Sequence, residues 1–126
     1  MSYKDKYIMN VKWAKLAEQE SALNIAITRY YYAAFVKVLS DLKTKNIKVD
    51  IDTSSNQHNN TIRKYADEVI KRDTKQQSRN RIDFINNMNT LKRIRHKAEY
   101  EEADVSTDDV RDAKQAFKFV DSLIVV

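Results

Sequence analysis

The chain has 126 residues, a length typical of one domain, and it contains no Gly, no Pro and no Cys. The missing cysteines exclude a disulfide scaffold and a cysteine zinc site, and no apolar run approaches the ~18 residues that a membrane-spanning helix needs. Without Gly or Pro, few tight turns can interrupt helices. We therefore expect one all-α domain over residues 1–126, cytoplasmic, with no membrane segment, metal site or cofactor.

The first helix is predicted over about residues 4–19, where apolar residues recur at helical spacing. Ile8 and Val11 share one face and Trp13 lies nearby, so the predicted apolar stripe is broad. A polar stretch follows, and Ser21 is a candidate N-cap for a second helix. Nothing in that stretch forbids one continuous helix, so both arrangements stay open.

Residues from about 21 to 45 carry the clearest helical pattern of the chain. Two apolar lines run along it, one through Ile25, Thr28, Tyr32, Phe35, Leu39 and Leu42, the other through Ile27, Tyr30, Tyr31, Ala34 and Val38. A helix that is apolar over so much of its circumference is predicted to lie at the centre of the fold. Arg29 is a charge embedded in this apolar belt.

The helical pattern stops over residues 46–60. Apolar and polar residues alternate over 47–51, which suggests a short extended piece. A third helix is predicted from near Ser55 to about residue 72, because a cluster of Thr, Ser and Asn there supplies capping groups. His58 falls in or just before its first turn.

Two further helices are predicted in the last third of the chain. Thr74 and Gln77 have capping-box spacing at the start of a helix over about 75–102. Ser106 and Asp109 repeat that spacing at the start of a helix over about 106–124. Five helices joined by short links predict an up-and-down bundle in which neighbouring helices are antiparallel.

One face of the predicted 75–102 helix carries an apolar seam that a charge interrupts. The seam steps by four, three, four and three residues through Phe84, Met88, Leu91, Arg95 and Ala98. A guanidinium on a buried face is costly unless it is paired or lines a wet pocket. Glu99 lies one turn later and can pair with Arg95. The pair is interpreted either as a structural ion pair or as a site in which Arg95 binds phosphate and Glu99 orients it.

The charges of the chain are unevenly distributed, although the formal net charge is only +5. Basic residues crowd positions 63–97, and acidic residues crowd positions 99–109. A basic centre is compatible with RNA or a nucleotide as partner, and equally with an ordinary solvated helix surface. The candidate contacts to such a partner are Arg29, Arg93, His96, Lys97 and Tyr100. Arg29 either stacks on a tyrosine or joins Arg95 in a shared pocket.

Three stretches, taken in order, resemble the HEPN superfamily of helical bundles, and in particular its small stand-alone bacterial and archaeal members. Residues 26–35 (AITRYYYAAF) resemble the family's Ala-Ile-x-Arg-x-Tyr-Tyr-Ala-x-Phe helix. Ser54, Ser55, His58 and Tyr65 resemble its Ser/Thr-rich entry into a helix with His and an aromatic residue. Residues 91–100 (LKRIRHKAEY) resemble its Leu-x-x-x-Arg-x-x-Ala-Asp-Tyr motif.

The resemblance implies an RNA- or nucleotide-binding protein of a toxin–antitoxin or phage-defence system, as a homodimer, with a nucleotidyltransferase-type antitoxin as possible partner. Catalytic members cleave RNA without a metal and use Arg followed, after four to six residues, by His. That spacing is absent here, since no Arg stands at the required distance before His58 or His96. By resemblance the catalytic candidates are Arg95, Glu99 and His58. The alternative is a non-catalytic helical module that binds a protein partner.

Overall fold

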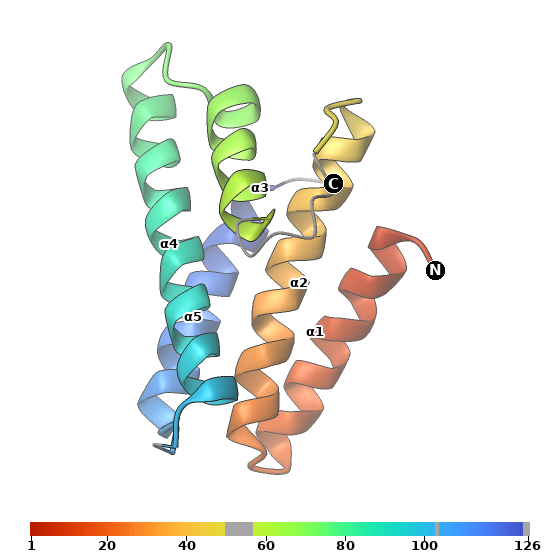
Figure 1. The fold of residues 1–126 in the computed structure, drawn as a ribbon, viewed down its shortest axis with the longest axis vertical. Coiled ribbons are helices and arrows are strands. Elements are labelled where there is room, and N and C mark those ends of the chain that lie inside the picture. Colours follow the sequence, from red (N-terminus) through yellow and green to blue (C-terminus); the bar gives the residue numbers. More distant parts are fainter. Residues whose placement is uncertain (50–56, 103, 125–126) are drawn as a thin grey trace.

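The computed structural model describes residues 1–49, 57–102 and 104–124. This part of the chain is all-α, as predicted, and its five helices pack against one another (Figure 1). The elements are α1 (Tyr3–Gln19), α2 (Leu23–Thr44), α3 (Gln57–Tyr65), a π-helical turn directly after it (Ala66–Ile70), α4 (Lys75–Tyr100) and α5 (Thr107–Leu123). No helix in the described ranges is both long and apolar enough to cross a membrane.

The centre of the bundle is formed by α2, α4 and α5, each of which contacts the other two. The first helix, α1, packs along α2 at one edge, and α3 lies beside α4 and α2 (Figure 1). Antiparallel pairs are formed by α1 with α2, α3 with α4, and α4 with α5. The prediction that the 21–45 helix is central is therefore confirmed.

Capping boxes begin three of the helices. In each box, the hydroxyl of the N-cap residue accepts a hydrogen bond from the backbone N–H of the residue three positions later. The side chain of that later residue accepts a hydrogen bond from the backbone N–H of the N-cap residue. The pairs are Ser2 with Asp5, Thr74 with Gln77, and Ser106 with Asp109. The boxes predicted at Thr74 and Ser106 are confirmed. They satisfy backbone N–H groups that the first turn of a helix leaves without a partner.

We expect Ser106→Ala to lower the free energy of unfolding by about 1 kcal/mol, because an alanine at the N-cap leaves a helix-start N–H unsatisfied. Thr107→Ala is the matched control, since this neighbouring exposed hydroxyl lies outside the capping box. Urea denaturation of both variants measures the difference. Equal stability of the two variants would show that the cap at Ser106 contributes nothing.

The first two helices are separate, and the prediction of Ser21 as N-cap is wrong. Ser21 has a φ of 59° and donates its N–H to the carbonyl of Glu18 at 3.1 Å. It therefore closes the C-terminal end of α1 in the left-handed conformation typical of helix ends. The residue before α2 is Ala22, which has no side-chain cap. The continuous helix that the sequence left open is also excluded.

The third predicted helix is observed with a modified end. It continues past Tyr65 as the π-helical turn and stops at Ile70, where Lys71 has a φ of 62° and donates its N–H to the carbonyl of Ala66. Its predicted start near Ser55 lies outside the described residues. The described part of the predicted extended piece, residues 47–49, has no regular secondary structure.

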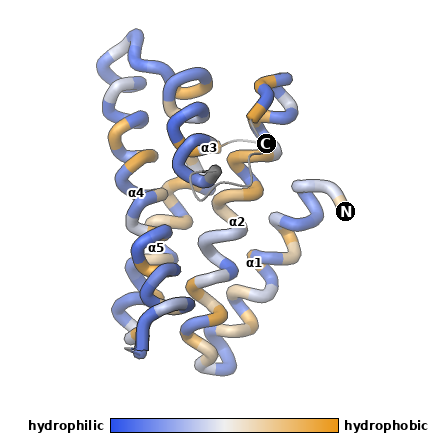
Figure 2. The backbone as a smooth tube through the Cα atoms, in the orientation of Figure 1, coloured by the Kyte–Doolittle hydropathy of each residue, from blue (hydrophilic) through white to orange (hydrophobic). Residues whose placement is uncertain are grey.

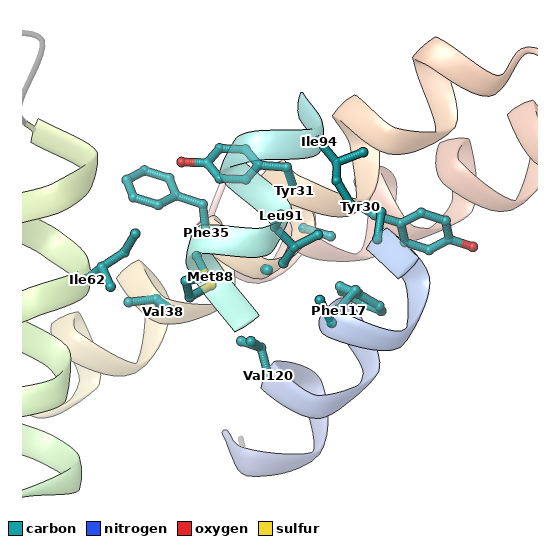
Figure 3. Packing of buried hydrophobic residues seen from close by; sticks show 14 of the residues in the cluster. Tyr30, Tyr31, Phe35, Val38, Ile62, Met88, Leu91, Ile94, Phe117 and Val120 are labelled. Atoms are coloured by element: carbon teal, nitrogen blue, oxygen red, sulfur yellow. The ribbon is translucent and has the colours of Figure 1, made fainter. Parts of the chain in front are cut away.

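The apolar seam of α4 is buried, as predicted. Phe84, Met88 and Leu91 are completely inaccessible, and Ala98 is nearly so. Figure 3 shows Met88 and Leu91 among side chains of α2 and α5. On α2, the line of residues that starts at Ile27 is buried throughout, whereas Ile25 of the other line is exposed. The core therefore lies where α2, α4 and α5 meet.

The apolar face of α1 differs from the predicted one. Ala14 and Ala17 are the residues of α1 that are buried against α2. Ile8 and Trp13, which the prediction placed in or beside a buried stripe, are exposed. Figure 2 shows hydrophobic stretches recurring along this edge helix. The two alanines let the backbones of α1 and α2 approach closely. Tyr7 and Val11 are partly buried against the core, whereas Ile8 and Trp13 are left outside.

Candidate functional site

Arg95 of α4 lies half-buried against two tyrosines of α2. Its Nη1 donates to the hydroxyl of Tyr32 at 3.1 Å. The guanidinium carbon lies 4.7 Å from the centre of the Tyr31 ring and 5.8 Å from that of Tyr32, which are cation–π distances. Its Nε is buried and has no hydrogen-bond partner among the residues that the structure describes. The charge on the α4 seam therefore points inward, at the contact between α2 and α4.

His58 joins this contact from the first turn of α3. Its Nδ1 is hydrogen-bonded to the hydroxyl of Tyr31, and its ring stacks on Phe35 with centroids 4.2 Å apart. Figure 3 shows the rings of Tyr31 and Phe35 side by side, with the Tyr31 hydroxyl on the side of its ring that faces away from Leu91. Three helices thus place one aromatic cluster around the guanidinium of Arg95.

The protonation states of this cluster follow from burial and from two cations. Burial lowers the pKa of the His58 imidazole below its usual range, and the charges of Arg95 and Lys92 lower it further. Burial raises the pKa of the Tyr31 hydroxyl, which therefore keeps its proton at neutral pH. His58 is accordingly a neutral imidazole at pH 7, because burial disfavours its charged form and protonation would place a third positive charge beside Arg95 and Lys92.

Lys92 supplies the second cation, three residues before Arg95 on α4. Its side chain is half-buried, and its ammonium group donates to Oδ1 of Asn59, the residue after His58. Burial, followed by the charge of Arg95, lowers the pKa of Lys92. Lys92 and Arg95 therefore repel each other, and the side-chain hydrogen bond that each donates goes to a neutral oxygen atom. Within the described residues, no carboxylate forms an ion pair with either.

The structure brings two of the three catalytic candidates together. Arg95 and His58 share the cluster around Tyr31, whereas Glu99 is exposed and makes no ion pair with Arg95 in the part of the chain that the structure describes. Glu99 is still close enough for its charge to raise the pKa of Tyr31. The structural Arg95–Glu99 ion pair that the sequence allowed is thus replaced by the hydrogen bond from Arg95 to Tyr32.

The other candidate residues lie outside this cluster. Arg29 is exposed and donates to Oδ1 of Asn10 on α1, so it does not enter a shared pocket with Arg95. His96 and Tyr100 are exposed beside each other, with ring centroids 5.2 Å apart. Arg93 is exposed on α4. Lys97 forms an ion pair with Asp109 of α5 at 2.8 Å.

Several members of the cluster were not singled out as site residues from sequence. Lys92 could have been found, because a lysine three residues before a seam arginine lies on nearly the same helix face. Tyr31, Tyr32 and Phe35 carry no such signal, since aromatic residues on a central helix are mostly core. Asn59 could not have been found, because its role depends on how α3 packs beside α4.

The lowered pKa of His58 predicts that stability falls as the pH drops below about 6.5, the ordinary value for histidine. In that range the unfolded chain binds a proton that the folded protein rejects, so the free energy of unfolding declines. One proton sets an upper limit of about 1.4 kcal/mol per pH unit on this slope. Urea denaturation between pH 5 and pH 7 measures it.

His58→Gln should remove this slope, whereas His96→Gln, at the exposed histidine, should keep it. If the pH dependence of stability survived in His58→Gln and disappeared in His96→Gln, it would come from His96, and the prediction would be wrong.

Comparisons with protein-family models, with curated proteins and with solved structures find no match to this chain.

Proposed function

We propose that the cluster of Arg95, Lys92 and His58 binds a phosphate group of RNA or of a nucleotide. The observation that carries this proposal is the pair of half-buried cations, Lys92 and Arg95, which contact neutral oxygens and, for Arg95, tyrosine rings, but no carboxylate of the described residues. Desolvated charges without a counter-ion are costly, and their mutual repulsion adds to the cost. A bound phosphate would reduce both the cost of desolvation and the repulsion between the two cations, because its oxygens accept charge-assisted hydrogen bonds from an ammonium and a guanidinium together.

Residues 26–35 and 91–100 support a more specific proposal, that the chain is a HEPN-type protein. The central helix and the α4 seam carry the motifs of that resemblance, and the cluster draws Tyr31, Tyr32 and Arg95 from them. On this proposal the protein works in the cytoplasm as a toxin or phage-defence component. A nucleotidyltransferase-type antitoxin would then be its protein partner.

The same geometry supports cleavage of RNA as an extension of binding. Arg95 would stabilise the charge that develops on the phosphate while the 2′-oxygen bonds to phosphorus, with no metal needed. The 2′-hydroxyl loses its proton, the bond from phosphorus to the 5′-oxygen of the next nucleotide breaks, and that oxygen leaves as a hydroxyl, which gives a 2′,3′-cyclic phosphate. The neutral imidazole of His58 is the group best suited to accept a proton at pH 7. Glu99, which is exposed, would have to act from the rim of the site.

Labelled single-stranded RNA tests binding and cleavage together. The RNA is incubated with the protein in EDTA over a range of salt concentrations, beside arms with a mononucleotide and with inorganic phosphate. We expect RNA binding that weakens with salt, since phosphate contacts release counter-ions. Cleavage of RNA, but not of its 2′-deoxy analogue, would support the ribonuclease extension. Absence of salt-dependent binding in every arm would overturn the proposal.

A second candidate, a non-catalytic module that binds a protein partner, is favoured by one observation. Glu99 is exposed and does not pair with Arg95, so the described side chains do not assemble a complete acid–base pair beside the guanidinium. The RNA experiment separates the candidates, because this module would neither cleave RNA nor bind it in a salt-dependent way.

A further inference from the structure

The outer face of α1, opposite its contact with α2, is unusually apolar for an exposed surface. The exposed fractions of its large apolar side chains are 54% for Ile8, 39% for Met9, 52% for Trp13 and 39% for Leu16. The residues of α1 buried against α2 are two alanines. Because α1 lies at the edge of the bundle, no described helix covers this outer face (Figures 1 and 2).

The exposed residues form an ordered seam. Steps of three, four, three and four residues lead along one face of α1 through Lys6, Met9, Trp13, Leu16 and Glu20. This is the spacing with which two helices pack side by side over many turns. All five residues are exposed. The seam has an apolar centre around Trp13, a positive residue at one end and a negative residue at the other.

The two end charges have no oppositely charged partner among the described residues of a single copy, although the Lys6 ammonium lies 5.9 Å from the centre of the Tyr3 ring. Within residues 1–49, 57–102 and 104–124, neither Lys6 nor Glu20 forms an ion pair. Each also stands at the less favourable end of the helix dipole, with the lysine near the start of α1 and the glutamate at its C-cap. Oppositely charged groups from another molecule would correct both.

We infer that this seam, of Lys6, Met9, Trp13, Leu16 and Glu20, binds a second copy of the chain, with the two α1 helices antiparallel about a twofold axis near Trp13. Trp13 lies seven residues from Lys6 and seven from Glu20. An antiparallel pair centred there sets Lys6 of each copy against Glu20 of the other. A parallel pair would set like charges together. The seam is therefore complementary to itself, as a twofold interface requires.

The charge balance of the seam also favours a copy over a nucleic acid. The chain carries a net charge of +5, so two copies repel each other over most of their surface. The five seam residues hold one positive and one negative charge, so they add no net repulsion of their own to self-association. The seam offers no net positive charge to attract the phosphates of an RNA.

The size of the seam limits the strength of the dimer. A helix of 17 residues is about 25 Å long and its face is about 10 Å wide. Such a face is smaller than the ~800 Å² that each partner of a standard interface buries. The dimer should therefore be concentration-dependent, and it has to be measured over a wide range of protein concentrations.

Sedimentation equilibrium of the whole chain tests the inference, with a monomer mass of 14.8 kDa as reference. We expect the mass to approach twice this value at high concentration, while the fluorescence of Trp13, the single tryptophan, shifts to shorter wavelength. Leu16→Glu should weaken dimerisation by about tenfold or more, because it places a charge in the desolvated centre. Ile82→Glu is the matched control, since Ile82 is also an exposed apolar residue but lies on α4, outside the seam.

Charge reversal tests the antiparallel arrangement itself. Lys6→Glu alone and Glu20→Lys alone should each weaken the dimer, because each sets like charges together. The double variant Lys6→Glu/Glu20→Lys should restore it, since every pair is again opposite in sign. Circular dichroism confirms that each variant is folded, which is expected because both side chains are exposed.

Three outcomes would overturn the inference: a monomer at every concentration, a dimer that Leu16→Glu leaves unchanged, or a seam that binds a different protein in place of a second copy. These outcomes are independent of phosphate binding, because no RNA is present and the seam contains none of Lys92, Arg95 or His58. Failure here would leave the proposed phosphate site untouched.

Discussion

Arg95→Ala should weaken the binding of single-stranded RNA by roughly tenfold to a hundredfold, the range that corresponds to one lost hydrogen bond to a charged group. The reason is geometric. The guanidinium is oriented by the Tyr32 hydroxyl and the Tyr31 ring, so its remaining N–H groups are aimed before a ligand arrives. The salt dependence should also fall, by about 0.7 in the slope of log K against log salt concentration.

Two further variants make this result specific to the cluster. Arg95→Lys keeps the charge and loses the planar fork, so it should preserve the salt slope while lowering affinity. Lys118→Ala removes the same unit of charge from an exposed position on α5 and should have little effect. Fluorescence anisotropy with labelled RNA measures all three. Equal losses of RNA affinity in Lys118→Ala and Arg95→Ala would mean that only the net charge of the protein matters, which would contradict a binding site at Arg95.

Phe84→Ala should lower the free energy of unfolding by about 3–5 kcal/mol, the usual range for removing a buried phenylalanine ring. Phe84 is completely inaccessible, and its ring centre lies 5.1 Å from that of Tyr65, so it joins α4 to the end of α3. A loss of this size is a large fraction of the total stability of a small domain, which is about 5–15 kcal/mol.

Ile82→Ala is the control for Phe84→Ala on the same helix. Ile82 is exposed, so its truncation should change stability by less than about 0.5 kcal/mol. Urea denaturation of both variants measures the contrast. If the two variants were equally stable, the seam that passes through Phe84 would not be the buried face of α4.

The helices could be predicted from sequence where local chemistry determines them. The hydroxyl and its partner three residues later mark the starts of α4 and α5 at Thr74 and Ser106, because a capping box involves only neighbouring residues. The seam of α4 is equally local, since its 3–4 spacing identifies the face that is buried. Arg95 was predicted to point inward for the same reason, and it does.

Other features depend on tertiary packing and could not be read from the pattern. The helix α1 is apolar on two sides, and spacing alone does not tell which side α2 covers. Ser21 has a side chain suitable for an N-cap, yet the chain reverses direction there, and the backbone N–H of Ser21 closes the end of α1 by donating to the carbonyl of Glu18. The pairing of Arg29 with Asn10 and of Lys92 with Asn59 each joins two helices, so sequence spacing carries no information about them.

The central claim, that Lys92, Arg95 and His58 form a phosphate site, is tested most directly by the imidazole signals of the two histidines in an NMR titration with inorganic phosphate. Burial and the charges of Arg95 and Lys92 lower the pKa of His58, and a bound anion should move its signals and raise that pKa because it offsets the two charges. His96, which is exposed, should not respond, and Arg95→Ala should abolish the response of His58. A titration in which His58 stays unchanged, or in which both histidines move alike, would contradict the account.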